Sequence, residues 1–315
     1  MNNTGYDIDL VYLWVDGRDP VWLEKRKRAI ESNPRYAGVN MTGRYESSDE
    51  LKYSIRSVIK HLPWIRKIFI ITDNQTPQWL NVNQEKIVII DHYEILPSVA
   101  LPCFNSAIIE YFIHRIPYLS EHFLYANDDM LVNANLSPSF FFADDGFPYA
   151  RFQYQLFQQT ETKLKEFFNI RINNYRRSII NATKLINSRF DVYFNGVSHH
   201  NFDGYLKNDL KNLIEVDFKN EFESVFTNKF RDPSDIQRIV FYLYSLAKKR
   251  AYLRYANRKE SCRIRVHKSD FMQMIHRFNP SLFCLNDTER ATDEHRKLIV
   301  PFLEQLFPEK TIYEK

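Results

Sequence analysis

The run Ile8-Asp-Leu-Val-Tyr-Leu-Trp-Val15 is almost continuously apolar and stops at the turn pair Asp16-Gly17. Such a run is typical of a β-strand that is buried on both faces of a parallel sheet. Three similar runs follow it, at residues 67–71, 86–90 and 122–126. These four runs predict the strands of one sheet and therefore decide the fold class.

Helical patterns separate these strands. Residues 51–62 place apolar side chains at helical spacing, and residues 105–116 form a second helical pattern. Alternation of strands with helices predicts an α/β protein with a mostly parallel, doubly wound sheet.

The pattern changes in the second half of the chain, which becomes helical from about residue 131. Residues 232–237 are expected to open a long helix that ends near residue 247. We therefore expect an α/β core over residues 1–145 and a mainly helical portion over residues 146–315. The second portion should pack on the core and complete a single site.

Composition excludes several classes of protein. The chain has 315 residues, 44% of them apolar, which is ample material for a folded core. Its 43 basic and 39 acidic residues leave a net charge of +4, which is too small to indicate a nucleic-acid partner. The glycine-rich phosphate loops of ATP- and dinucleotide-binding proteins are missing from the sequence.

The cysteines and the apolar runs indicate a compartment. Cys103, Cys262 and Cys284 lie far apart in the sequence, which fits a reducing cytoplasm better than a disulfide framework. No secretory leader is visible, and no apolar run approaches the roughly 18 residues that a membrane span needs. We therefore expect a cytoplasmic protein.

Each predicted strand ends at an acidic residue: Asp16, Asp73, Asp91 and the pair Asp128–Asp129. Ligands of open parallel sheets bind outside these carboxyl ends. Capping of the next helix is the simpler interpretation of Asp91. Two adjacent carboxylates repel each other, so the pair indicates a bound cation, and hard oxygen ligands suit Mg²⁺ or Mn²⁺.

Longer segments resemble the Stealth family of sugar-phosphate transferases. The opening match runs from Ile8 to Pro20, and further matching segments follow in order across nearly the whole chain. They are residues 49–57, 61–68, 71–75, 101–110, 114–117, 119–130, 197–199, 229–237 and 282–287.

The resemblance implies an enzyme that transfers a hexose-1-phosphate, with N-acetylhexosamine-1-phosphate favoured, from a UDP-sugar such as UDP-GlcNAc to an acceptor hydroxyl. UMP is released, and a phosphodiester forms in a bacterial capsular or cell-surface polysaccharide. The sheet would be of the GT-A or Rossmann-like type, and the cofactor Mg²⁺ or Mn²⁺. The acceptor would be a lipid-linked glycan or a growing polysaccharide, with peripheral association at the inner membrane as a further expectation.

The resemblance also assigns roles to residues. Its catalytic residues match Glu110, Asp129, His199 and Arg231. The base is His199 or Glu110, and Arg231 would hold the transferring phosphoryl group. After His199 the chain reads His200-Asn201-Phe202 and lacks the proline that family members often have there, so His200 stays an alternative. Nucleotide-sugar contacts are expected from Asp16, Gly17, Asp73 and Asn105, and metal contacts from Asp129, Asp128, Asn127 and Asp287.

Alternatives remain open for the function and for one segment. An ordinary glycosyltransferase would share the sheet and the metal but release UDP, and a silent glycan-binding subunit would need no intact carboxylates. Nine basic residues lie between Lys248 and Lys268. They form either a solvated helix face or a surface that attracts the polyanionic product or an anionic membrane.

Overall fold

A five-stranded sheet in the order β3-β2-β1-β4-β8 forms the centre of the protein. The structure is a computed structural model that describes residues 5–36, 49–268, 270–287 and 290–315. The first four strands are parallel, and the edge strand β8 is antiparallel to β4. The predicted mostly parallel sheet is thus confirmed. Its strands are β1 (Ile8–Leu13), β2 (Ile68–Thr72), β3 (Ile87–Asp91), β4 (His122–Asn127) and β8 (Asp203–Leu206).

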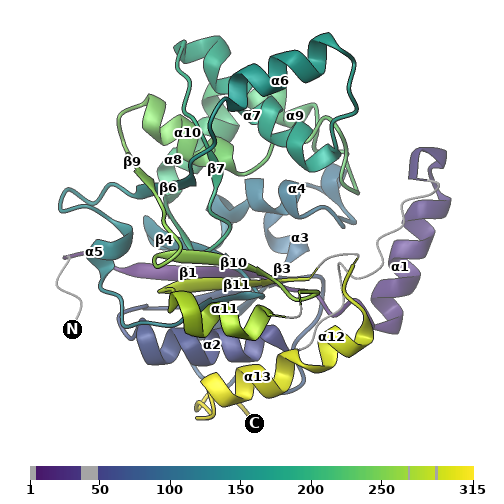
Figure 1. Cartoon of the computed structure of the whole chain (residues 1–315). Coiled ribbons are helices and arrows are strands. Elements are labelled where there is room, and N and C mark those ends of the chain that lie inside the picture. The colour runs from purple at the N-terminus through teal and green to yellow at the C-terminus, as the bar shows by residue number, and fades with distance from the viewer. Residues whose placement is uncertain (1–4, 37–48, 269, 288–289) are drawn as a thin grey trace.

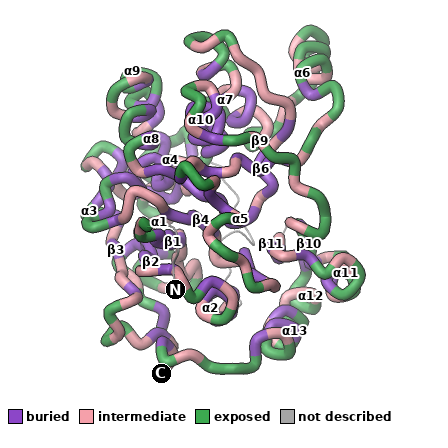
Figure 2. The backbone as a smooth tube through the Cα atoms, turned by 90° about the vertical axis from the view of Figure 1, so that its left-hand side faces the viewer, coloured by how far each residue is buried: buried purple, intermediate pink, exposed green. Residues whose placement is uncertain are grey.

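Both faces of the sheet are covered, which explains the continuous apolar run of β1. Leu10 and Tyr12 pack in one core cluster with apolar residues of α2 (Glu50–His61). Val11 packs in another cluster, to which α4 (Ser106–Tyr111), α7 (Asn174–Phe190) and α10 (Ile239–Ala247) contribute. Figure 1 shows α2 on one side of the strands and α4 on the other, and Figure 2 shows the strands as mostly buried.

The second half of the chain adds helices, as expected, and strands that the pattern did not reveal. Two further sheets have the orders β10-β11-β5 and β7-β6-β9. Their strands are β5 (Met130–Val132), β6 (Tyr149–Gln153), β7 (Val197–Ser198), β9 (Tyr252–Tyr255), β10 (Ser261–Arg265) and β11 (Leu282–Asn286). The basic tract between residues 248 and 268 forms β9, β10 and the turns around them, so its interpretation as a helix face is wrong.

Two predicted helices are shorter than expected. The pattern over residues 105–116 forms α4 and then a 3₁₀ turn at Ile113–Arg115. The helix expected from residue 232 begins at Ile239, because Asp235 is held in the preceding turn by side-chain hydrogen bonds. The remaining helices are α1 (Pro20–Glu31), α3 (His92–Ile95), α5 (Pro138–Phe141), α6 (Gln158–Phe167), α8 (Lys207–Asn212), α9 (Lys219–Glu223), α11 (Phe271–Phe278), α12 (Asp293–Lys297) and α13 (Ile299–Leu306).

Strand pairing brings distant segments to the carboxyl end of β4. On one side, Asp203 of β8 lies opposite Tyr125. Just beyond β4, Cys284 of β11 lies opposite Met130 of β5. Within the described ranges, no helix combines the length and the apolar character that crossing a bilayer requires.

Candidate active site

The acidic turn after β4 contains a carboxylate with one unsatisfied oxygen. Asp129 Oδ2 accepts a hydrogen bond from the Cys284 thiol at 3.1 Å. Asp129 Oδ1 is buried and has no hydrogen-bond partner among the described residues. A buried carboxylate oxygen without a donor is costly, so this atom fits a position that faces a bound cation.

Three potential metal ligands meet at this turn. One ligand atom each from Asp129, His200 and Cys284 lies within 4.8 Å of the others. Burial, followed by the charges of Arg238 and Arg263, lowers the pKa of His200 to about 3, so its imidazole is neutral at neutral pH. Neutral imidazole and carboxylate together suit a divalent cation.

The electrostatics of the acidic pair also fit a cation. Burial and then the charge of Asp129 raise the pKa of Asp128 well above its usual range. Burial raises the pKa of Asp129, against the hydrogen bond from Cys284. The Cys284 thiol is itself held protonated, because burial and the Asp129 charge raise its pKa well above normal. The protonated Cys284 thiol donates a hydrogen bond to Asp129 and thereby orients the carboxylate.

Glu110 of α4 lies on the other side of the β4 end and is buried. The Tyr125 hydroxyl is 2.8 Å from Glu110 Oε1 and 2.9 Å from Asn127 Oδ1. Arg238 Nη1 lies 3.8 Å from the same Glu110 oxygen. Burial raises the pKa of Glu110, and the Arg238 guanidinium opposes this most strongly.

Behind Glu110, a buried chain of polar groups leads to His199. Arg238 Nη2 donates to Asp203 Oδ2 at 3.1 Å, and the guanidinium lies 4.7 Å from the Tyr125 ring centre. His199 Nε2 lies 2.9 Å from Asp203 Oδ1, and Nδ1 lies 2.9 Å from Ser261 Oγ. His199 has no exposed surface, so both of its ring nitrogens are engaged with protein.

Arg231 is exposed at the edge of this network. Its Nη2 lies 3.3 Å from Ser106 Oγ, one residue after the cap of α4. Its charge also lowers the pKa of Glu110, by less than Arg238 does. The structure therefore brings Arg231 and Glu110 into one electrostatic environment.

The residues expected to bind nucleotide sugar have different surroundings. The main chain of Asp16 exchanges two hydrogen bonds with the Gln75 side chain, at 2.8 and 3.0 Å, which joins the ends of β1 and β2. Gly17 follows directly, and both residues are partly accessible. Asp73 is buried against Lys25, whose ammonium lies 2.6 Å from Oδ1.

Asn105 serves the fold in this structure. Its side-chain oxygen caps α4 by accepting from the Ala107 N–H, and its amide donates to Asp235 at 2.9 Å. It is fully buried. These bonds fix the turn that leads into α10 and thereby place Arg238.

Two other acidic residues lie outside the cluster. Asp287 follows β11 and forms an ion pair with Arg296 at 2.7 Å. Asp91 caps α3 by accepting from the Tyr93 N–H at 2.8 Å, which confirms the capping interpretation.

Sequence reasoning missed Arg238, Asp203 and Ser261. Arg238 had a usable signal, because it directly precedes a nine-residue apolar helix and a buried arginine needs an acidic partner. Asp203 had no such signal in the sequence, because its partners are brought to it by the pairing of β8 with β4.

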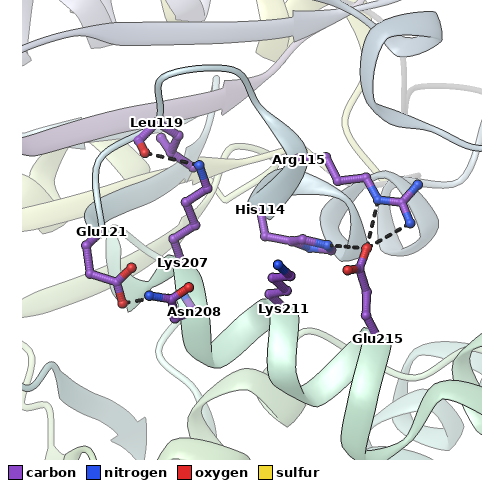
Figure 3. Close-up of a pocket in the computed structure, with 8 residues that line it drawn as sticks. All are labelled: His114, Arg115, Leu119, Glu121, Lys207, Asn208, Lys211 and Glu215. Carbon is purple, nitrogen blue, oxygen red and sulfur yellow. Dashed lines mark hydrogen bonds and ion pairs between the residues drawn. The ribbon is translucent and has the colours of Figure 1, made fainter.

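A pocket in the described part of the chain lies away from this site. A pocket of about 600 Å³ is located at the amino end of β4 (Figure 3). Its central ion group joins Glu215 to His114 at 2.9 Å and to Arg115 at 2.8 Å. The lining residues are His114, Arg115, Leu119, Glu121, Lys207, Asn208, Lys211 and Glu215.

Two family regions and several solved structures match the chain. Residues 6–34 match Stealth protein conserved region 1, and residues 44–150 match conserved region 2. The galactosyltransferase LgtC, solved with donor and acceptor sugar analogues, aligns with a TM-score of 0.44 and 12% identity over 94% of this chain and 95% of its own. The glycosyltransferase GlyE of Streptococcus pneumoniae TIGR4 aligns with a TM-score of 0.42 and 10% identity over 96% and 62%.

Two of three sequence relatives match nearly the full length of this chain. Capsular polysaccharide phosphotransferase WcwK of Streptococcus pneumoniae is 30% identical over 98% of this chain and 99% of its own. Receptor polysaccharide phosphotransferase WefC of Streptococcus oralis is 30% identical over the same shares. Exopolysaccharide phosphotransferase cps2G of Lactiplantibacillus plantarum is 40% identical over 60% of this chain and 51% of its own. The chain belongs to the Stealth family and is a phosphotransferase.

Proposed function

We propose that this phosphotransferase moves N-acetylhexosamine-1-phosphate from a UDP-sugar to a hydroxyl of an acceptor glycan in the synthesis of a capsular or cell-surface polysaccharide. The hydroxyl oxygen attacks the β-phosphorus, and the bond from that phosphorus to UMP breaks. The C1–O bond of the sugar stays intact, and the hydroxyl proton passes to a base on the enzyme. The names of the relatives support the polysaccharide setting.

One observation supports this reaction above the others. Tyr125 of β4 contacts a buried carboxylate, Glu110, and the turn after β4 carries Asp129, a carboxylate with an unsatisfied oxygen. Phosphoryl transfer needs a base for the attacking hydroxyl and positive charge for the departing phosphate. Glu110 is the candidate for the base, and Asp129 is the candidate to hold a cation that would supply the positive charge.

We assign the role of base to Glu110 in preference to His199. Both ring nitrogens of His199 are engaged by Asp203 and Ser261. Burial raises the pKa of Glu110, which makes it a better proton acceptor near neutral pH than an ordinary glutamate.

His199 and Arg238 then act as positioning residues. His199 holds Asp203, Asp203 holds Arg238, and Arg238 faces Glu110. The positive charge of the Arg238 guanidinium favours the ionised form of Glu110, which is the form that accepts a proton.

Asp129 and His200 would hold the divalent ion, with Cys284 orienting Asp129. Bound there, such an ion neutralises charge on the diphosphate. A nitrogen donor beside a carboxylate favours Mn²⁺ over Mg²⁺. Asp128 and Asn127 are further candidates, whereas Asp287 is engaged by Arg296.

Other groups around this centre suit the two substrates. Arg231 offers a planar fork for the transferring phosphoryl group. Asp16, Gly17 and Asp73 follow β1 and β2 on the same edge and suit the nucleotide.

We place the reaction in the cytoplasm, with the enzyme peripheral to the inner membrane where lipid-linked acceptors are held. The parts before and after residue 145 act as one catalytic unit, because Asp129 and His200 come from different parts.

Product analysis tests the reaction. The purified protein is incubated with a panel of UDP-sugars, Mn²⁺ or Mg²⁺ and acceptor glycan, and products are identified by mass spectrometry. UMP together with a sugar phosphate on the acceptor supports the proposal. UDP with a glycosylated acceptor identifies an ordinary glycosyltransferase instead, and no turnover of any donor supports a glycan-binding subunit.

A further inference from the structure

Helix α6 (Gln158–Phe167) has its polar and apolar faces reversed relative to an ordinary surface helix. Its acidic side chains point toward α7, where Glu161 binds Arg176 at 2.7 Å and Glu166 binds Arg177 at 3.0 Å. Glu166 also binds Lys184 of α7 at 2.9 Å. The contacts that attach α6 to the rest of the protein are thus largely ion pairs, whereas a soluble helix normally attaches through its apolar face.

The apolar side chains of the same segment face solvent. Phe157 is 70% exposed, Phe167 is 79% exposed and Phe168 is 64% exposed. Leu164 lies within the helix, and Phe157 and Phe168 are its two cap residues. Exposed large apolar side chains that gather in this way mark an interaction surface. We call this surface, formed by Leu156, Phe157, Leu164, Phe167, Phe168 and Ile170, the α6 surface.

Two exposed basic side chains, Lys163 and Arg171, lie within the segment that forms the α6 surface. Three others, Lys165, Arg176 and Arg177, pair with the acidic side chains. Residues 154–177 contain five basic and two acidic side chains, which leaves a net charge of +3. Both acidic side chains, Glu161 and Glu166, are engaged in ion pairs. At the other end of the surface, Tyr154 contacts Tyr255 of β9 at 5.1 Å between ring centres, and β9 belongs to the basic tract.

The position of the α6 surface in the molecule leaves it accessible. Both views place α6 at the end of the molecule opposite α13 and the C-terminus (Figures 1 and 2). It lies in the helical layer beyond the sheet, away from the strand ends that hold Asp129. A partner bound there would leave the catalytic edge free.

We propose that the α6 surface is an interfacial docking site for an anionic lipid bilayer. Exposed phenylalanines flanked by lysine and arginine are the composition that inserts to the depth of the headgroups and is held by anionic lipids. A second copy of the chain fits less well, because a twofold contact would bring two positive patches together. This proposal rests on the peripheral placement given above and names the surface that achieves it.

Vesicle binding of the full chain tests the docking site. Sedimentation is measured with vesicles of phosphatidylglycerol and phosphatidylethanolamine and, in parallel, with phosphatidylcholine alone. We expect binding to the anionic vesicles that weakens as salt increases, and little binding to phosphatidylcholine. The double variant Phe167→Ser/Phe168→Ser should lower vesicle affinity at least about tenfold. The charge variant Lys163→Glu/Arg171→Glu should lower it as well and reduce the dependence on salt.

A matched control removes exposed apolar side chains far from α6. Tyr118 is 89% exposed and Ile312 is 67% exposed, so Tyr118→Ser/Ile312→Ser should bind vesicles as the parent does. Turnover of UDP-sugar in solution is measured for all variants and should be unchanged. Three outcomes would overturn the proposal. The control could lose as much vesicle affinity as the α6 variants, or both α6 variants could bind vesicles as the parent does. The third is that the protein does not bind vesicles but self-associates, and the phenylalanine variant abolishes this self-association. Failure of donor turnover in the parent protein bears on the catalytic proposal alone, because vesicle binding needs no turnover.

Discussion

The two ends of β4 differ in how their charges are satisfied. At the amino end, Glu215 is paired with both His114 and Arg115 in a pocket of about 600 Å³. At the carboxyl end, Asp128 and Asp129 lie side by side, and one carboxylate oxygen of Asp129 has no hydrogen-bond partner among the described residues.

This difference shows that unsatisfied charge, more than hollow volume, identifies the reactive edge of this sheet. Ion pairs that satisfy each other stabilise a surface and leave little capacity for a ligand. Adjacent, half-buried carboxylates are unfavourable without a cation, so their presence indicates a site that is completed by a ligand.

The largest effect is expected at Asp129. Asp129→Asn removes the charge and keeps the shape, so kcat should fall on the order of 1000-fold while the protein stays folded. Chelation should abolish turnover, and added Mn²⁺ or Mg²⁺ should restore it. Mn²⁺ binding, measured by electron paramagnetic resonance, should be lost in Asp129→Asn and in His200→Ala. Cys284→Ser keeps a hydrogen-bond donor toward Asp129, so its loss of kcat should be small. Full activity in EDTA would contradict the metal site.

The base assignment predicts the next largest effect. Glu110→Gln should lower kcat by on the order of 100-fold or more with donor binding kept, since a base acts on the acceptor hydroxyl. The parent enzyme should lose kcat/KM as pH falls, with an acid limb above the ordinary glutamate pKa of about 4.3. This limb should disappear in Glu110→Gln and remain in His199→Ala. The opposite result would make His199 the base.

Substitutions of Arg238 and of Arg231 should have different effects on the pH dependence of kcat/KM. Removing the cation in Arg238→Met should raise the pKa of Glu110, so the acid limb of kcat/KM should move to higher pH, with a loss on the order of tenfold at neutral pH. Arg238→Lys should restore part of this shift. Arg231→Lys keeps the charge and loses the planar fork, so it should weaken donor interaction and leave the limb in place. Equal pH profiles for all three proteins would remove Arg238 from its positioning role.

The smallest effect on activity is expected at the amino end of β4. His114→Gln should keep kcat within about twofold and lower the free energy of unfolding by about 1–2 kcal/mol through loss of the bond to Glu215. Burial lowers the pKa of His114, with Glu215 opposing this effect. The unfolded chain therefore binds the proton more tightly, and stability should fall as pH decreases below about 6.5. Thermal unfolding at several pH values should show a weaker slope in the variant, and a large loss of turnover would give this pocket a catalytic role.

Much of the central sheet was predictable because its signals are local. The apolar runs of β1, β2, β3 and β4 identify buried strands without reference to any distant residue. The capping role of Asp91 and the acidic pair after β4 are also visible within a few residues. Alternation around Ile264, which is buried between exposed Arg263 and Arg265, is a strand signal in the basic tract that the charge count obscured.

The polar network behind Glu110 was not predictable, because each of its bonds joins distant segments. Arg238 and Asp203 are 35 residues apart, and His199 and Ser261 are 62 residues apart. Their meeting depends on the register of β8 on β4 and on the turn that Asn105 fixes. A sequence pattern reports what a residue does to its neighbours in the chain, and these partners are neighbours only after folding.

The contact between Asp129 and Cys284 has a consequence for synthesis of the enzyme. The two residues are separated by 155 positions. At about 5–20 residues per second, a ribosome needs roughly 8–31 s to make that interval. Throughout this time the nascent chain displays the acidic turn without β11, and β5 has no antiparallel neighbour. Competence for transfer therefore begins only after β11 has been made and has closed the edge around Asp129.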